Sequence, residues 1–328
     1  MGNAQTRLPQ ASLHLLVSQG IELSWQQKYE EADSVFQEVL REFPNHPAGY
    51  IYRAGVMQSK ALDYERNIDV PPFDSLIELG KNKAKAMIER GEDPVWGYFF
   101  IGTAEGYDSY ARVYRGDWFG GLMRGLASVS AFKDALKADS AMYDACAGIG
   151  AFYYWRSRKT EHFNWLPFVG DDRPEAYVLL NKSVDHGLYN RYTALSMLVT
   201  IYIDAGEHEK AVEAARSGLQ QCPANRTFLW GLATALHKMG AFPEAAQAYQ
   251  TLLAAIIDDR EKNHYNETVC RLNLAKVRME LGEGAEAKKQ LETILRFRED
   301  EFLPHLKSRV QDKLEQCRLL LAKLSENR

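Results

Sequence analysis

Residues 192–257, YTALSMLVTIYIDAGEHEKAVEAARSGLQQCPANRTFLWGLATALHKMGAFPEAAQAYQTLLAAII, contain one pattern twice. Aligning Gly206 with Gly240 also aligns Ala211 with Ala245, which gives a period of about 34 residues. The first copy consists of Leu195, Leu198, Tyr202, Gly206, Ala211, Leu219 and Pro223. The second consists of Leu229, Leu232, Leu236, Gly240, Phe242, Ala245, Tyr249 and Leu253.

Each copy predicts two amphipathic helices joined by a turn. Apolar residues recur every three or four positions on both sides of the central glycine, as on one face of a helix. Gly206 and Gly240 suit the left-handed residue that ends a first helix. Ala211 and Ala245 are small, which allows two antiparallel helices to approach closely. A single hairpin cannot bury its apolar face, so the copies must stack.

The period and these residues closely resemble the tetratricopeptide repeat family. The resemblance implies an all-α fold, a right-handed α-α superhelix of about seven helical hairpins with a C-terminal capping helix. It also implies that the first helix of each pair lines a concave groove. The expected division is a flexible N-terminus (1–12), repeat units near 13–46, 47–94, 95–142, 143–191, 192–225, 226–267 and 268–301, and a capping helix (302–328).

The middle of the chain departs from this pattern. In the second unit, Pro71 and Pro72 predict a loop before a helix at about 73–90, since neither proline suits a helix interior. The third and fourth units contain extra sequence, 105–126 and 155–173, rich in aromatic residues. Insertions within repeats map to loops, often on the binding face, so specialisation is expected here.

Composition and motifs exclude several functions. A formal net charge of -4 and a pI near 6.1 give no basic footprint, so no nucleic-acid partner is expected. No apolar run reaches the length of a transmembrane helix. No metal-binding, phosphate-binding or nucleophile motif is found, so we expect no metal, no cofactor and no enzymatic activity.

Residues 1–6 fit both a myristoylation pattern and the start left by a removed leader, so a cytoplasmic and an exported location both stay open. The oligomeric state is also open.

An aromatic cluster is the candidate binding site. Placing the first helices of the hairpins around a groove directs Tyr52, Trp96, Phe99, Tyr107, Tyr110, Tyr154 and Trp155 toward it, with Arg158 at its edge and Trp230 farther along. The inserted residues Trp118, Phe119, Phe163, Trp165 and Phe168 would line or plug this groove. Aromatic and arginine side chains carry most binding energy at protein interfaces. The alternative is that these rings fill a core enlarged by longer helices.

Two functions from different classes follow from this cluster. The first is a non-enzymatic scaffold that binds a segment of a protein partner in its groove. The second is a receptor or carrier that encloses a small apolar ligand among the central aromatic residues. A closed, ring-lined cavity near Trp96 and Trp155 favours the second function, and an open groove with exposed rings favours the first.

Overall fold

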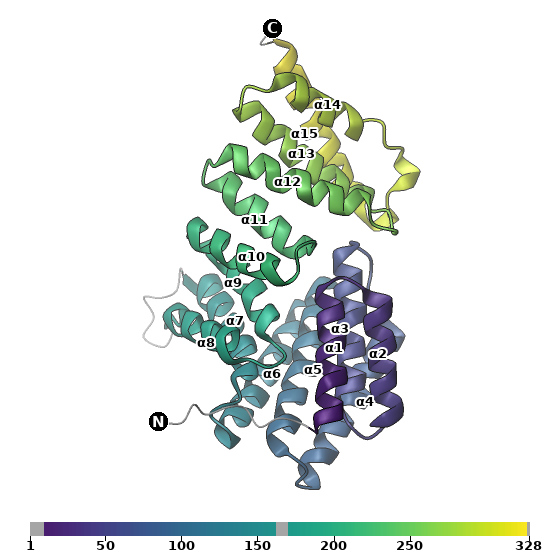
Figure 1. The fold of residues 1–328 in the computed structure, drawn as a ribbon, viewed down its shortest axis with the longest axis vertical. Coiled ribbons are helices and arrows are strands. Elements are labelled where there is room, and N and C mark those ends of the chain that lie inside the picture. Colours follow the sequence, from purple (N-terminus) through teal and green to yellow (C-terminus); the bar gives the residue numbers. More distant parts are fainter. Residues whose placement is uncertain (1–9, 162–169, 327–328) are drawn as a thin grey trace. The chain divides into compact units, whose positions relative to one another are not determined.

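The computed structural model describes residues 10–161 and 170–326. Within these residues the chain is all-α, with fifteen α-helices and no strand (Figure 1). The helices are α1 (Ala11–Trp25), α2 (Tyr29–Glu42), α3 (Ala48–Asp63), α4 (Val70–Glu89), α5 (Pro94–Tyr114), α6 (Trp118–Ala138), α7 (Tyr143–Thr160), α8 (Arg173–His186), α9 (Arg191–Ala205), α10 (His208–Gln221), α11 (Arg226–Lys238), α12 (Phe242–Ile257), α13 (His264–Glu280), α14 (Gly284–Ile294) and α15 (Lys307–Glu326).

Consecutive helices pack as hairpins. Contacts join α1 to α2, α5 to α6, α7 to α8, α11 to α12 and α13 to α14, and Figure 1 shows these pairs following one another along the chain. Each amphipathic helix thereby buries its apolar face against its neighbour in sequence. The predicted all-α fold of consecutive helical hairpins is therefore confirmed.

The turn and contact positions of the repeat behave as predicted. Gly206 and Gly240 have φ values of 77° and 76°, in the left-handed region that a residue with a side chain rarely adopts. Ala211 and Ala245 are completely buried. Phe228 packs so closely on Gly218 that a Cβ atom there would lie 2.5 Å from its ring. Small residues thus allow the helix axes to approach.

The loop predicted around Pro71 and Pro72 is wrong. Both prolines lie in the first turn of α4, which begins at Val70. A proline is tolerated there because the first N–H groups of a helix have no intrahelical acceptor, and its fixed φ suits the helix.

The extra sequence at 105–126 is mostly helical rather than a loop. It extends α5 to Tyr114 and starts α6 at Trp118, so this hairpin is built from two helices of 21 residues each. Of the second insertion, residues 155–160 belong to α7, and α8 begins at Arg173. Phe163, Trp165 and Phe168 lie outside the described residues.

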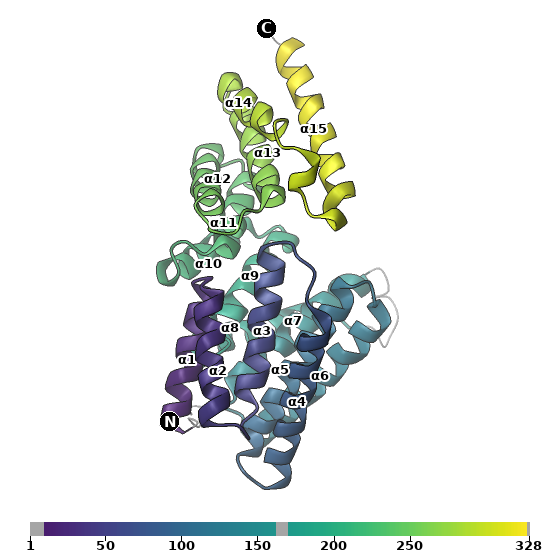
Figure 2. The same ribbon diagram turned by 90° about the vertical axis from the view of Figure 1, so that its right-hand side faces the viewer.

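The chain forms two compact units. Unit 1 comprises residues 1–60 and 68–198, and unit 2 comprises residues 61–67 and 199–328. Unit 2 has one apolar core around Leu236, Tyr249 and Leu274, a second around Leu291 and Cys317, and a third around Tyr265 and Phe302. The second core lies where α15 packs against α13 and α14, which Figure 2 shows beside one another.

Candidate functional site

Four of the predicted site residues are buried in unit 1. Tyr52, Trp96, Phe99 and Tyr154 are each at most 5% exposed. The Trp96 ring lies 5.3 Å from Phe99 and 5.2 Å from Tyr189 between centroids, and Tyr52 lies 6.1 Å from Tyr189. These distances are typical of packed aromatic pairs. Tyr52, Trp96 and Phe99 form an aromatic core with Tyr189, so a partner cannot reach these rings without moving the helices around them.

Tyr189, which sequence analysis did not single out, is central to this core. It lies in the turn between α8 and α9, and the buried Asp144 on α7 fixes that turn. The Asp144 carboxylate accepts hydrogen bonds from the backbone N–H groups of Leu188, Tyr189 and Asn190, at 2.9, 2.7 and 2.7 Å. Burial raises the pKa of Asp144, and these hydrogen bonds oppose that effect. A single buried aspartate in the first turn of a helix gave no sequence signal.

The other predicted site residues are more accessible. Tyr110 is 51% exposed on α5, whereas Tyr107 is partly buried and burial raises its pKa to about 12. Trp155 and Arg158 are partly buried on α7, and the Trp155 ring packs at 5.1 Å on the buried Tyr154. Trp230 is partly buried on α11, in unit 2. The structure therefore separates the predicted cluster into a buried core and a few accessible side chains.

The first half of α6 carries a large exposed apolar surface. Its side chains, from 44% to 76% exposed, are Trp118, Phe119, Leu122, Met123 and Leu126, and we call them the α6 face. Their spacing of three or four residues places them on one side of the helix. The opposite side, with Ser128, Ala131 and Ala135, is buried. The sequence marked Trp118 and Phe119 as part of an insertion but gave no indication of this helical face.

Charged and hydroxyl side chains hold α6 against α5. Arg124 lies 3.3 Å from a carboxylate oxygen of Glu105 and 3.2 Å from one of Asp108, and both carboxylates are buried. Lys81 on α4 pairs with Glu105 at 2.7 Å. Ser128 donates a hydrogen bond to the backbone oxygen of Gly102 at 2.7 Å. These contacts fix the rotation of α6 about its axis, so the α6 face stays outward.

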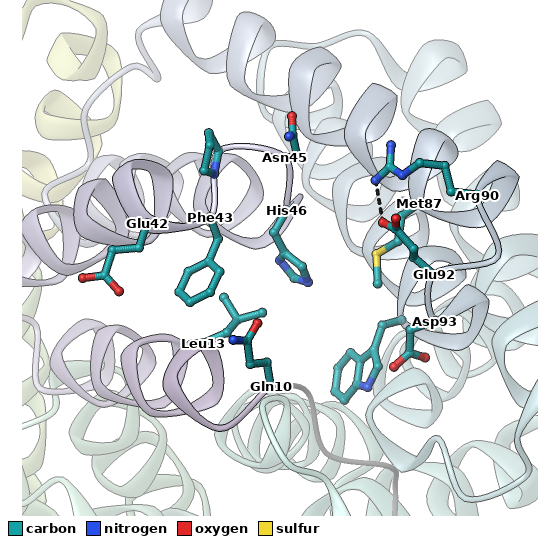
Figure 3. A pocket seen from close by; sticks show the side chains of 12 residues that line it. Gln10, Leu13, Glu42, Phe43, Asn45, His46, Met87, Arg90, Glu92 and Asp93 are labelled. Atoms are coloured by element: carbon teal, nitrogen blue, oxygen red, sulfur yellow. Dashed lines mark hydrogen bonds and ion pairs between the residues drawn. The ribbon is translucent and has the colours of Figure 1, made fainter.

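A separate cavity of about 470 Å³ lies at one end of α1, α2, α4 and α5. Its apolar wall includes Leu13, Phe43 and Met87 (Figure 3). Trp96 also lines it. Its charged side chains are Glu42, Arg90, Glu92 and Asp93, and Figure 3 shows His46 pointing into the opening between the two sides. Trp155 does not line this cavity.

His46 is neutral at physiological pH. Burial lowers its pKa from 6.5 to about 4, and its ring packs edge-on against Phe100 at 5.3 Å. Its Nδ1 atom accepts a hydrogen bond from the backbone N–H of Ala48 at 3.2 Å, so the proton is on Nε2. His46 therefore presents an N–H donor rather than a positive charge.

The lowered pKa of His46 predicts a loss of stability in acid. The unfolded chain binds a proton at His46 below about pH 6.5 and the folded chain only near pH 4, so the free energy of unfolding falls as pH decreases through this window. We expect His46 to contribute a loss of about 2 kcal/mol between pH 7 and pH 5. Urea unfolding of the wild type and of His46→Gln at both pH values measures this loss as the difference between their pH dependences. Equal dependences contradict the prediction.

Among residues 10–161 and 170–326, no group of three or more His, Cys, Asp or Glu side chains is arranged to hold a metal ion. No helix in this part of the chain is both long enough and apolar enough to span a membrane.

Family models described as tetratricopeptide repeat match residues 196–260 and residues 21–46. No curated protein matches the chain. One similar solved structure is the C-terminal part of a tetratricopeptide repeat-containing protein from Cytophaga hutchinsonii, with 14% identity, coverage of 91% of this chain and 99% of that chain, and a TM-score of 0.47. Another is PilW, a type IV pilus biogenesis factor, with 13% identity, coverage of 87% and 93%, and a TM-score of 0.41.

The human IFIT1 dimer with m7Gppp-AAAA is similar at 10% identity, with coverage of 98% of this chain and 82% of that chain and a TM-score of 0.47. The longer match covers most of residues 192–257, in which the sequence contains the repeat pattern twice. Together with the consecutive helical hairpins, the family models show that the chain contains tetratricopeptide repeats, at residues 21–46 and 196–260.

Proposed function

We propose that this protein is a non-enzymatic scaffold that binds a protein partner, and that the α6 face is its principal contact surface. Tetratricopeptide repeat proteins are usually non-enzymatic and typically mediate protein–protein interaction. Stacked helical hairpins suit that role because each layer adds surface to a rigid support.

The exposure of the α6 face carries this proposal. Trp118 and Phe119 are 70% and 76% exposed, although burying one such side chain stabilises a protein by roughly 2 kcal/mol or more. Contiguous exposed apolar surface of this kind marks interaction sites in monomeric proteins. Tryptophan is also strongly enriched among the residues that dominate binding energy at interfaces.

Only some of the residues that the sequence places in the groove are accessible to a partner. The buried members, including Tyr52 and Trp96, support the fold, which leaves Tyr110, Trp155 and Arg158 as candidate contacts in unit 1. Trp230 remains a candidate in unit 2. We propose that the partner contacts these accessible side chains in addition to the α6 face.

The alternative function, a receptor for a small apolar ligand, lacks a supporting observation in the described part of the chain. The cavity beside Trp96 includes four charged side chains, and Trp155 lies elsewhere. An apolar ligand in this cavity would remove water from carboxylates without replacing their hydrogen bonds, which is unfavourable.

The scaffold proposal predicts that polar substitution of the α6 face abolishes partner binding without affecting folding. We expect the double variant Trp118→Ser/Phe119→Ser to lose at least one protein that the wild type captures, with roughly a tenfold or greater loss of affinity. The free energy of unfolding should change by less than about 1 kcal/mol, because these side chains are exposed. Quantitative mass spectrometry of proteins captured by each variant, with thermal unfolding in parallel, measures both effects.

Leu15→Ser is the matched control, because Leu15 is a 69% exposed apolar residue on α1, outside the α6 face. This control should retain every partner. If the double variant also retains every partner, the α6 face is not the contact surface. The double variant Tyr110→Ala/Trp155→Ala then tests the remaining candidate contacts in unit 1.

A further inference from the structure

The cavity beside His46 has the size and composition of a ligand site. Its volume of about 470 Å³ falls within the range of small-molecule sites in proteins. One side is formed by residues of α1 and of the chain after α2, and the other by residues at the end of α4 and the start of α5 (Figure 3). It is distinct from the α6 face, so the inference below does not depend on the proposed function.

The wall of the cavity suits an apolar stem. Phe43 and Trp96 contribute aromatic rings, and Leu13 and Met87 contribute aliphatic and thioether groups. Aromatic rings also attract cations through the negative potential of their faces. The cavity therefore favours a ligand that combines apolar length with positive charge.

The charges around the cavity point to the same class of ligand. Arg90 donates a hydrogen bond to Glu92 at 2.8 Å, so its positive charge is already paired. The carboxylates of Asp93 and Glu42 form no ion pair with a described residue. His46 adds no positive charge because it is neutral. The cavity thus has an excess of negative charge, which favours cations and disfavours anions.

Asp93 does not have the usual structural role of an aspartate at this position. It occupies the N-cap of α5, but its side chain makes no capping hydrogen bond. Its backbone has φ 54°, in the left-handed region where aspartate and asparagine are tolerated better than most residues. The carboxylate is therefore available to a ligand at the rim of the cavity.

We propose that this cavity binds an organic cation carried on an apolar stem, that is, an alkylammonium or guanidinium group. The stem packs against Phe43, and the cation interacts with Asp93. When the ligand is a peptide, the Nε2–H group of His46 donates to one of its carbonyl oxygens. Such a ligand is either a basic side chain of a peptide or a free polyamine.

Calorimetric titration at low ionic strength tests this proposal with four probes. They are Nα-acetyl-lysine methylamide, its neutral analogue Nα-acetyl-norleucine methylamide, the acidic Nα-acetyl-glutamate methylamide, and the free diamine cadaverine. We expect a cationic probe to bind roughly tenfold or more tighter than the neutral one, and the acidic probe not to bind. Tighter binding of the lysine derivative than of cadaverine indicates a peptide ligand, and the reverse order indicates a free amine.

The proposal is wrong if neither cation binds, or if the norleucine or glutamate derivative binds as tightly as the lysine derivative. Variants separate recognition from folding. Asp93→Asn keeps a residue that tolerates the left-handed backbone, and it should weaken binding of the cationic probes roughly five- to tenfold. Arg90→Gln releases Glu92 and should strengthen binding roughly threefold.

Asp185→Asn is the matched control. Asp185 is exposed on α8 in the same unit, and the variant makes the same change in charge. It should leave the affinity unchanged. If Asp93 has only a structural role, Asp93→Asn leaves the affinity for the cationic probes unchanged and Arg90→Gln does not strengthen binding. Either of these two results overturns the proposal.

Discussion

Replacing Trp96 by alanine is expected to destabilise unit 1 by about 3–5 kcal/mol. Trp96 is 1% exposed and packs against Phe99, Phe100 and Tyr189, with ring centroids 5.2–5.9 Å away. Removing the indole group leaves a void in this aromatic core, and the tightly packed helices collapse into it only in part. Guanidinium unfolding followed by circular dichroism measures the change.

Trp118→Ala is the matched control for Trp96→Ala. It removes the same side chain from a position that is 70% exposed and should change the free energy of unfolding by less than about 1 kcal/mol. The two variants together test whether Trp96 belongs to the core or to a binding surface. If Trp96→Ala costs less than about 1 kcal/mol but reduces partner capture, Trp96 belongs to the binding surface and not to the core.

Replacing Arg226 by alanine is expected to destabilise unit 2 by about 3–5 kcal/mol. The Arg226 side chain is 9% exposed and forms ion pairs with Asp63 and Asp259, which are 10% and 15% exposed. Burial disfavours the charged guanidinium, but the two carboxylates keep its pKa above the usual value. Tyr64 donates to Asp259 at 3.0 Å, and its ring lies 5.5 Å from the guanidinium. Removing Arg226 takes a buried guanidinium away from both carboxylates.

Urea unfolding of unit 2 measures the cost, and Arg298→Ala serves as the control. Arg298 pairs with Asp300 on the surface, where the side chains are 73% and 67% exposed, so its loss should leave the free energy of unfolding nearly unchanged. Substituting Asp63→Asn in the Arg226→Ala background should recover part of the loss, because it removes one uncompensated charge. If Arg226→Ala and Arg298→Ala cost the same, the buried ion pairs do not stabilise unit 2.

Arg226 and Asp63 also show why sequence patterns could not identify these buried ion pairs. The two residues are far apart in the chain, and neither belongs to a motif. Asp63 lies in the short segment 61–67, which belongs to unit 2 although the residues on either side belong to unit 1. Such a contact depends on the path of the whole chain, and periodicity reports only on neighbours within about two helical turns.

The candidate site shows a similar limit of sequence patterns. Helical spacing assigned aromatic residues to helices that are α3, α5 and α7 in the structure, but it could not show which side of each helix the neighbouring helices cover. Trp96 faces inward because the Tyr189 turn, fixed by Asp144, packs on it, and Phe99 packs on Phe132 of α6. Trp118 and Phe119 face outward because Gly121 and Ser128 occupy the side of α6 that contacts α5.

The sequence by itself determined that this chain is an all-α stack of helical hairpins. Apolar residues every three or four positions, left-handed glycines such as Gly206, and small residues such as Ala211 are local requirements of helices, turns and close helix packing, so they are visible without coordinates. Only the tertiary structure decided which aromatic residues form the core, which five side chains form the α6 face, and which charges surround the cavity beside His46. Burial and ion pairing depend on residues distant in sequence that the fold brings together, and no local pattern encodes them.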